Sequence, residues 1–496
     1  MKRSLVLVTV DCLRADHTGF MGYPRPTSPF LDELARETLV FPRAIVTGAP
    51  TYYSFPGLLA SRYPLSLGRE VVGSAPGEAT LTTALLAAGY RTAAFLAANP
   101  YLSARFGYEQ GFETFLDFGS ATGDGRGGRG AINKNHRGFT TKLNQRISKL
   151  AHALAPLGKL YAEAYFQYCQ RISGAARENW ESLRRFPSAD FIVDQACDWL
   201  RTAGGQPFFL WLHFMDPHAP YYPTPQALAA MGNNISPIRA HYLNESWKRG
   251  DIGAHRLRGY RDEIVNLYDA GIRWVDMQLA RLADFLRASS LWDSCVFVAT
   301  ADHGEEFLDH GGVFHSPARQ YQEMLHVPLL IRVPGVEKKL SAAPFSLLHL
   351  APTILDAMGI DAPPEFAGRS YWPEVQAGGG WDRAISESVG NCTNPMDPRK
   401  RMAGRVLVVQ DERYKFILDF DSGAEELYDL ESDAQEQNKL PGNAARKVRA
   451  RMLRAAHEHL DRQRKRRNAG TALRALAREI GLEWSHSGKP AETLAN

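Results

Sequence analysis

The chain alternates short apolar runs with amphipathic stretches, the pattern typical of a parallel sheet covered by helices. Unbroken runs of β-branched, aliphatic and aromatic residues predict buried strands within four segments, Ser4–Asp16, Arg91–Leu96, Pro207–Pro223 and Ser294–Glu305. Apolar residues at helical spacing predict helices within Arg25–Phe41, Thr80–Gly89, Asp262–Leu286 and Leu347–Gly359. Strands that are apolar on both faces belong to sheets with helices on both sides. The pattern therefore predicts an α/β fold.

Three of the predicted strands end in acidic or imidazole side chains. They are Asp11 after the first strand, Asp216 and His218 after the third, and Asp302 and His303 after the fourth. In open α/β sheets, ligands bind beyond the carboxyl ends of the strands. Carboxylates suit hard cations and imidazole tolerates borderline ones. We therefore predict one divalent metal ion (Mn, Ca, Mg or Zn) on Asp11, Asp302 and His303, unless Asp11 only caps its turn.

Four separated blocks of the sequence resemble one known family. The blocks are VDCLRADHTGFMGYPRPTSPFLDELA, ATADHGEEFLDHG, HVPLLIRVPG and ELYDLESDAQEQNKL. In this order they resemble the sulfatase branch of the alkaline phosphatase superfamily, from residue 4 to about 440 except for 119 to about 188. The resemblance implies a large mixed, mostly parallel sheet sandwiched by helices, with a smaller C-terminal antiparallel sheet domain. It also implies an ester hydrolase or phosphotransferase.

The nucleophile region departs from that family. In the resembling sulfatases a Cys-x-Pro-Ser-Arg motif supplies a cysteine that is converted to formylglycine. In the block GAPTYYSFPGLLASRYP, Thr51 aligns with the cysteine, Ser54 with the serine and Phe55 with the arginine. Because formylglycine is not made from threonine, we expect Thr51 to bind the cation and attack directly, as a threonine does in related phosphodiesterases and phosphoethanolamine transferases. The alternatives are that Thr51 only caps a helix and that Ser54 attacks.

Further site residues are assigned from the same resemblance. His218 falls on the leaving-group side, where an imidazole can protonate a departing alkoxide. His315 falls in a loop that lies close to the nucleophile in the family. Asn99 and Asp216 are candidate substrate-binding residues. Asn99 is a candidate donor to a phosphoryl oxygen or a turn residue, and Asp216 alternatively orients His218 or caps a turn. His310 is a weaker candidate for substrate binding, because its Asp-His-Gly turn is usually structural.

The length predicts more than one domain, since 496 residues exceed what a single core usually supports. We place a catalytic domain at 1–380, with a variable helical insertion at 119–188. Short strands joined by turns, at Val406–Gln410, Arg413–Asp419 and Glu425–Leu430, predict a small α+β subdomain at 381–440. A basic helical tail follows at 441–496. A solvated helix is the simplest interpretation of this tail, and binding to an anionic surface is the alternative.

Composition narrows the class of protein further. The net charge of +4 gives no argument for a nucleic-acid partner, and five scattered cysteines without CxxC spacing argue against disulfides or a thiolate zinc site. No uncharged stretch reaches the ~18 residues of a membrane span, and the first apolar run is too short for a signal peptide. We expect a cytoplasmic enzyme, unless a signal has been trimmed, that acts on a small-molecule, glycan or lipid ester. An oligomer is compatible with the sequence.

These observations lead to one hypothesis and two alternatives. The hypothesis is a metal-dependent hydrolase or transferase that acts on phosphate or phosphonate esters through a covalent Thr51 intermediate. The first alternative is a sulfatase in which Thr51 or a metal-bound water attacks. The second belongs to another class, a binding protein that has kept the fold and lost activity. It is suggested by the departures from the sulfatase pattern at Thr51, Phe55 and Asn99.

Overall fold

The computed structural model describes most of the chain. The described residues are 2–69, 71–119, 163–164, 166–167, 179–337, 344–377, 383–441 and 445–479. Side chains of the last helix are described as far as residue 466. Most of the predicted insertion at 119–188 lies outside the described residues.

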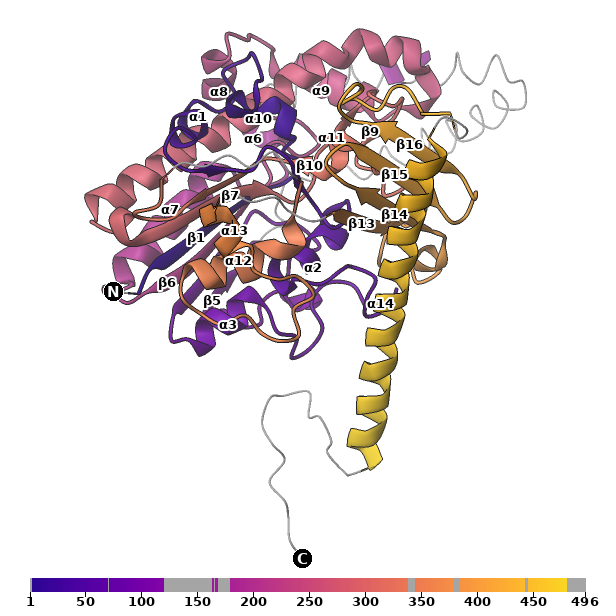
Figure 1. Ribbon diagram of the computed structural model, residues 1–496. Coiled ribbons are helices and arrows are strands. Elements are labelled where there is room, and N and C mark those ends of the chain that lie inside the picture. Colours follow the sequence, from indigo (N-terminus) through magenta and orange to yellow (C-terminus); the bar gives the residue numbers. More distant parts are fainter. Residues whose placement is uncertain are drawn as a thin grey trace, which may run out of the picture.

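A seven-stranded sheet forms the centre of the molecule (Figure 1), with the strand order β2-β11-β7-β1-β6-β4-β5. The strands are β1 (Ser4–Val10), β2 (Leu39–Val40), β4 (Arg91–Leu96), β5 (Thr114–Leu116), β6 (Phe208–Phe214), β7 (Cys295–Ala301) and β11 (Leu329–Arg332). β1 pairs in parallel with β6 and β7, and β4 pairs in parallel with β5 and β6. β11 runs antiparallel to β7 and β2. The predicted mixed, mostly parallel sheet is confirmed.

Helices cover both faces of this sheet. Figure 1 shows α7 (Ala189–Thr202) and α10 (Ala254–Ala288) on one side, with α3 (Leu81–Ala87) and α12 (Leu350–Ala357) on the other. Every residue of β1, β6 and β7 is buried. Because a strand covered on both faces has no solvent side, these three strands are apolar along almost their whole length.

A second, four-stranded antiparallel sheet lies towards the C-terminus, with the order β13-β14-β15-β16. Its strands are Ala384–Val389, Arg405–Gln410, Tyr414–Asp419 and Glu425–Asp429. The long basic helix α14 (Arg446–Glu479) packs on it through Met452, Ala455 and Ala456, and its far end projects beyond the body (Figure 1). The small C-terminal sheet is confirmed. Helix α14 is therefore not solvated on all sides. The domain boundary near residue 380 stays a prediction.

Shorter elements complete the described structure. The helices are α1 (Pro29–Leu34), α2 (Thr51–Ala60), α6 (Trp180–Leu183), α8 (Pro225–Ala230), α9 (Pro237–Trp247), α11 (Gln322–Leu325) and α13 (Trp372–Ala377). The strands are β3 (Ala44–Ile45), β8 (Glu306–Phe307), β9 (Val313–Phe314), β10 (His326–Val327) and β12 (Phe345–Ser346). Among the described residues, no helix is both long enough and apolar enough to cross a membrane.

Strand register brings the predicted site residues to one edge of the large sheet. Val10 pairs with Ala301 of β7, so Asp11 and Asp302 are the next residues on neighbouring parallel strands. The backbone N–H of Asp11 donates to the carbonyl of Phe214 at the end of β6, at 2.9 Å. The carboxyl ends of β6, β1 and β7 therefore meet, as expected for a site at the edge of a parallel sheet.

Candidate active site

Three side chains from two neighbouring strands converge beyond the sheet edge. Asp11, Asp302 and His303 are fully buried, and one ligand atom of each lies within 4.8 Å of the other two. His303 Nε2 lies 3.6 Å from Asp11 Oδ1 and 3.6 Å from Asp302 Oδ2. The Nδ1–H of His303 donates to the carbonyl of Gly304 at 2.7 Å, which leaves the Nε2 lone pair on the side of the carboxylates. The structure brings the three predicted ligands together.

This cluster has the chemistry of a divalent cation site. Oδ2 of Asp302 has no hydrogen-bond partner among the described residues, although it is buried. Burial and the negative charge of Asp11 raise the pKa of Asp302 to about 8. Two buried carboxylates side by side are unfavourable unless a positive charge compensates them. A divalent ion would provide that charge, so the residues present fit one.

Thr51 faces the cluster from the first turn of α2. Its Oγ1 lies 3.2 Å from His303 Nε2, and the residue borders the cavity described below. Pro50 is the N-cap of α2 and the helix begins at Thr51, with no side-chain capping hydrogen bond. Thr51 therefore does not have the capping role that its position suggested. The hydroxyl of Ser54, the alternative nucleophile, donates to the Thr51 carbonyl at 3.1 Å, and Ser54 does not border the cavity.

Asp11 is held from β4 and β6. The side-chain amide of Asn99 donates to Asp11 Oδ2 at 2.7 Å, and His213 Nε2 lies 3.3 Å from the same oxygen. Burial alone would raise the pKa of Asp11, but His218, His213 and His303 hold it well below its usual range. Asn99 thus orients a predicted ligand. His213 contacts Asp11, although its place within an apolar strand favoured a role in the core. The sequence feature that could have indicated this contact is a single polar residue within a buried apolar run.

Two histidines face the cluster from the opposite wall. The rings of His218 and His315 lie 5.0 Å apart, and both residues border the cavity. The Nδ1–H of His218 donates to the carbonyl of Ala219, so its Nε2 is the nitrogen that can exchange a proton. His315 Nδ1 lies 3.2 Å from Oε1 of Glu305, a fully buried carboxylate that the sequence analysis missed. The sequence feature that could have identified Glu305 is its position directly after Asp302-His303-Gly304.

The pKa values of the two histidines are shifted in opposite directions. Burial lowers the pKa of His218 below its ordinary value. Burial also acts to lower the pKa of His315, but the carboxylates of Glu305, Asp11 and Asp302 together outweigh it and raise that pKa above its ordinary value. The pair therefore combines a neutral imidazole with one that holds its proton more firmly.

Cys12 lies between the Asp11 carboxylate and the His315 ring. Its thiol donates to Asp11 Oδ1 at 3.1 Å, and its Sγ lies 3.6 Å from His315 Nδ1. Burial, together with the charge of Glu305, raises the pKa of Cys12 well above its ordinary value, so the side chain stays a neutral thiol. Tyr268 of α10 donates to the Cys12 carbonyl at 2.6 Å and fixes the turn after β1.

Backbone strain marks the same site. Cys12, Ala98 and Phe314 have φ angles of 62°, 56° and 66°, in the left-handed region that favours glycine. Each is next in sequence to a polar residue of the site. Strained residues persist where the surrounding structure holds them and are concentrated at functional sites.

A cavity of about 480 Å³ ends at the cluster. Thr51, Asn99, His218 and His315 border it near the buried carboxylates. Its walls are largely aromatic and apolar and include Tyr52, Tyr101, Phe186, Met215, Val313 and Phe314. The cavity is large enough for a small organic ester, and its polar residues are concentrated at one end.

Asp216 and His310 do not border this cavity. Asp216 Oδ1 accepts a hydrogen bond from the N–H of Ala189 at the start of α7, at 3.2 Å, and burial raises its pKa to about 7. His310 Nδ1 lies 2.6 Å from Glu323 Oε1, and its ring stacks on Tyr321 with the centroids 3.7 Å apart. Both side chains contact neighbouring elements outside the cavity, and a role of either in substrate binding stays a prediction.

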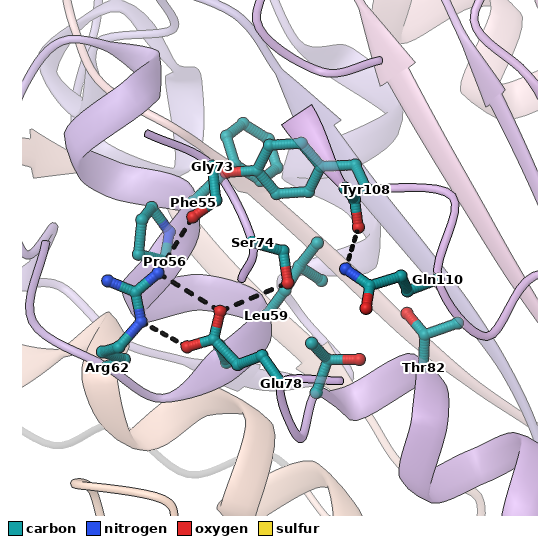
Figure 2. A pocket seen from close by; sticks show the side chains of 13 residues that line it. Phe55, Pro56, Leu59, Arg62, Gly73, Ser74, Glu78, Thr82, Tyr108 and Gln110 are labelled. Atoms are coloured by element: carbon teal, nitrogen blue, oxygen red, sulfur yellow. Dashed lines mark hydrogen bonds and ion pairs between the residues drawn. The ribbon is translucent and has the colours of Figure 1, made fainter. Parts of the chain in front are cut away.

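A second, narrower cavity lies beside the later turns of α2 (Figure 2). Figure 2 shows Arg62 and Glu78 facing each other, and they form an ion pair. Arg62 also donates to the Gly73 carbonyl at 2.9 Å. None of the cation-cluster residues borders this cavity. Its charged groups compensate one another, so we assign it a structural role.

The mixed sheet and the small C-terminal sheet define an α/β fold of the alkaline phosphatase type. Residues 3–360 match the family described as Sulfatase, and residues 310–466 match N-sulphoglucosamine sulphohydrolase, C-terminal. The chain belongs to the sulfatase family and is an ester hydrolase of the alkaline phosphatase superfamily. Members of this family typically bind a divalent metal, and the cluster described above supplies donors for one.

Individual relatives differ in the activity that their names state. The chain is 23% identical to the multifunctional alkaline phosphatase superfamily protein PehA of Trinickia caryophylli, over 90% of this chain and 92% of PehA. It is 22% identical to an N-acetylglucosamine-6-O-sulfatase of Bacteroides thetaiotaomicron, over 52% of this chain and 58% of that protein.

Solved structures share the fold at low sequence identity. One was determined in complex with its substrate D-glucosamine-2-N,6-O-disulfate. It has a TM-score of 0.67 at 17% identity, covering 94% of this chain and 99% of that one. The phosphonate monoester hydrolase of Agrobacterium radiobacter has a TM-score of 0.62 at 20% identity, covering 94% and 96%. These likenesses establish the fold and leave the substrate to be argued from the site.

Proposed function

We propose that the protein is a metal-dependent hydrolase or transferase of phosphate or phosphonate esters that forms a covalent intermediate on Thr51. The observation that carries this proposal is the 3.2 Å contact between Thr51 Oγ1 and His303 Nε2, inside the buried cluster of Asp11 and Asp302. A hydroxyl is a weak nucleophile at neutral pH and needs a neighbouring metal or base to become reactive. The position of Thr51 beside a cation site supports this role.

Asp11, Asp302, His303 and Thr51 would hold the divalent ion, and Mn, Ca, Mg and Zn all suit this donor set. When bound, the ion supplies positive charge that favours the Thr51 alkoxide and offsets the charge on the phosphoryl oxygens. Thr51 is also the first residue of α2, so the helix dipole favours negative charge at its oxygen.

The residues of the chain then have distinct tasks. Thr51 gives up its hydroxyl proton to solvent, and its Oγ1 forms a bond to phosphorus while the bond from phosphorus to the leaving oxygen breaks. His218 or His315 gives the leaving oxygen a proton. Asn99 keeps Asp11 in place by its hydrogen bond. Water in a hydrolase, or an acceptor hydroxyl in a transferase, then gives a proton back to that histidine and attacks phosphorus, and the bond to Thr51 Oγ1 breaks as Thr51 regains a proton from solvent.

Replacing Thr51 tests the proposal. Thr51→Ala should lower the turnover of bis(4-nitrophenyl) phosphate by at least about a thousandfold, because the attacking oxygen is lost. Thr51→Ser keeps a hydroxyl and should retain turnover within about a hundredfold of the wild type. Ser54→Ala is the matched control and should leave turnover nearly unchanged. Full activity of Thr51→Ala would overturn the proposal.

A sulfuric ester hydrolase is the second candidate function, because the matching family and several relatives are sulfatases. Rates on 4-nitrophenyl sulfate and bis(4-nitrophenyl) phosphate, measured on one preparation, separate the two candidates. We expect faster turnover of the phosphate diester, because Thr51 stands where sulfatases carry the formylglycine precursor. Faster turnover of the sulfate would favour the second candidate.

A further inference from the structure

The two histidines of the site are surrounded by apolar side chains. The rings of Phe186 and His218 lie 5.5 Å apart at an interplanar angle of 83°. Phe314 precedes His315 in the chain, and both border the cavity together with Met215. On the proposed mechanism these histidines protonate the leaving group, so the leaving group would lie against Phe186, Phe314 and Met215.

The charge of the site limits the charge of the substrate. No Lys or Arg is among the described residues that border the cavity. The cluster already contains the buried carboxyl groups of Asp11, Asp302 and Glu305. Phe55 stands where the motif arginine would be, and its ring packs 5.5 Å from that of His213. Among the described residues, only a bound divalent ion and the His315 imidazole would offset these carboxyl groups, so a monoanionic ester fits best.

The polar groups of the cavity are concentrated at the cluster and are sparse elsewhere. Tyr52 donates its hydroxyl to the carbonyl of Cys392. The other hydroxyl groups on the described lining away from the cluster belong to Tyr101, Ser316 and Thr393. A sugar brings several hydroxyl groups that lose their water on binding, and each one left without a partner costs affinity. An apolar alcohol has no such cost.

Phe314 gives independent support. It lies in β9, paired with Glu306 of β8, and is held at a φ of 66°. A bulky residue at positive φ is an outlier that costs about 1–3 kcal/mol. An aromatic side chain kept at the cavity despite this cost is evidence that its position serves the site.

We propose that Phe186, Met215 and Phe314 form an apolar leaving-group subsite, which makes the protein prefer esters whose leaving group is an aromatic or aliphatic alcohol without further hydroxyl groups. This inference rests on the proposed function, which assigns the leaving-group side to His218 and His315. It goes further by excluding polyanionic sugars as preferred substrates.

A matched pair of substrates tests the subsite. Two phenylphosphonate monoesters carry leaving groups of equal size and similar acidity, 4-ethylphenol and 4-(hydroxymethyl)phenol. We expect the wild type to turn over the ethylphenyl ester with a kcat/KM about tenfold higher, because a buried hydroxyl group would lack a partner. Equal values, or preference for the hydroxymethyl ester, would overturn the proposal.

Variants of Phe186 and Phe314 test whether the preference for the ethylphenyl ester arises from the subsite. Phe186→Ala and Phe314→Asn should reduce the tenfold ratio to below about threefold, and Asn tolerates the positive φ at position 314. Phe420→Ala changes a phenylalanine that is 47% exposed on the C-terminal sheet and should keep the wild-type ratio. An unchanged ratio in both Phe186→Ala and Phe314→Asn would contradict the subsite.

A binding measurement separates this proposal from the proposed function. In the corresponding phosphinates a methylene group replaces the bridging oxygen, so they cannot be cleaved. Calorimetric titration should show tighter binding of the ethylphenyl phosphinate to the wild type and equal binding of the pair to Phe186→Ala. This result would support the subsite even if Thr51→Ala kept full activity. Equal binding of the two phosphinates to the wild type would overturn it.

Discussion

Asp11 shows how the active site is built at the scale of single residues. It lies at the tip of the central strand, where the amide of Asn99 and the ring of His213 both reach its Oδ2. Cys12 donates to its other oxygen. A fully buried carboxylate with three such neighbours is held in one orientation.

Removing the Asn99 amide should disturb this orientation. We expect Asn99→Ala to lower kcat/KM by about 10- to 100-fold, because a hydrogen bond to a charged group contributes roughly 1.5–3 kcal/mol. Steady-state kinetics measures the loss, and Asn438→Ala, at an exposed position, is the control. Unchanged kinetics of Asn99→Ala would show that Asp11 does not need this support.

The proton donor can be identified by the choice of leaving group. His218→Ala and His315→Ala should each be compared on an aryl ester and on an alkyl ester of the same phosphonate. A general acid contributes about 10²- to 10⁴-fold where the leaving oxygen is basic and much less where it is a good leaving group. The variant that loses more activity on the alkyl ester has lost the acid. Equal losses on both esters, in both variants, would exclude this role for either histidine.

The sequence was enough to locate residues that directly follow a strand, while their roles in metal binding and catalysis stay predictions. Asp11, Asp302 and His303 follow apolar strands directly, so they could be placed at one edge before the structure was known. Glu305 and His213 were not assigned to the site, because their roles depend on which side chain each one meets across the fold.

At the scale of elements, α14 is anchored through one buried carboxylate. Glu387 of β13 accepts a hydrogen bond from Gln463 of α14 at 3.0 Å and lies 3.3 Å from His459 Nε2. It also accepts from the N–H of Leu65, which follows the α2 helix, at 3.0 Å. The C-terminal helix, the small sheet and the segment after the proposed nucleophile thus share one polar centre.

This contact predicts how stability depends on pH. Burial would raise the pKa of Glu387, but His459 and Arg405 outweigh it and lower the pKa from 4.5 to about 2. Because the folded-state pKa is depressed, the contribution is complete above pH 4.5 and is lost as the pH falls towards 2. Glu387→Gln should lower the free energy of unfolding at pH 7 by on the order of 3 kcal/mol, and by less at pH 3.5.

Urea unfolding at the two pH values measures this difference. Glu412→Gln, at an exposed position of the same sheet, should unfold like the wild type at both pH values. An equal destabilisation by Glu387→Gln at pH 7 and pH 3.5 would contradict the depressed pKa.

Element prediction succeeded where periodicity was strong and failed where context decides. The core strands and α12 were visible as apolar patterns, whereas β13, with the sequence AISESV, was missed because its serine and glutamate side chains are buried and hydrogen-bonded. The helix predicted at 262–286 begins earlier, at Ala254, since its first turns are polar and give no apolar period.

At the scale of the whole molecule, a buried cation would link the central sheet to α2. The donors come from the tips of β1 and β7 and from the first residue of α2, which are far apart in sequence. An ion that binds only the folded state stabilises the folded protein, by about 2.7 kcal/mol when the ion concentration is a hundred times its dissociation constant.

The type of fold could be predicted from the strand pattern and the family resemblance. The side-chain contacts between distant segments could not be predicted from them.

Removal of the metal should therefore lower both activity and stability. We expect chelation followed by dialysis to abolish turnover and lower Tm, and Mn²⁺ to restore both. Differential scanning calorimetry with metal analysis makes the measurement, and Asp302→Asn should show little response to the ion, because it loses one anionic donor. A wild-type Tm that is unaffected by chelation, in protein shown to be metal-free, would contradict a cation at this cluster.

The central claim is that Thr51 carries the phosphoryl group during turnover. Acid quenching within the first turnovers of an aryl phosphonate, followed by peptide mass spectrometry, tests this most directly. We predict the added mass of the phosphonyl group on the peptide that contains Thr51, and no such mass in Thr51→Ala. Turnover without any adduct, or an adduct on Ser54 with Thr51 unmodified, would contradict the account.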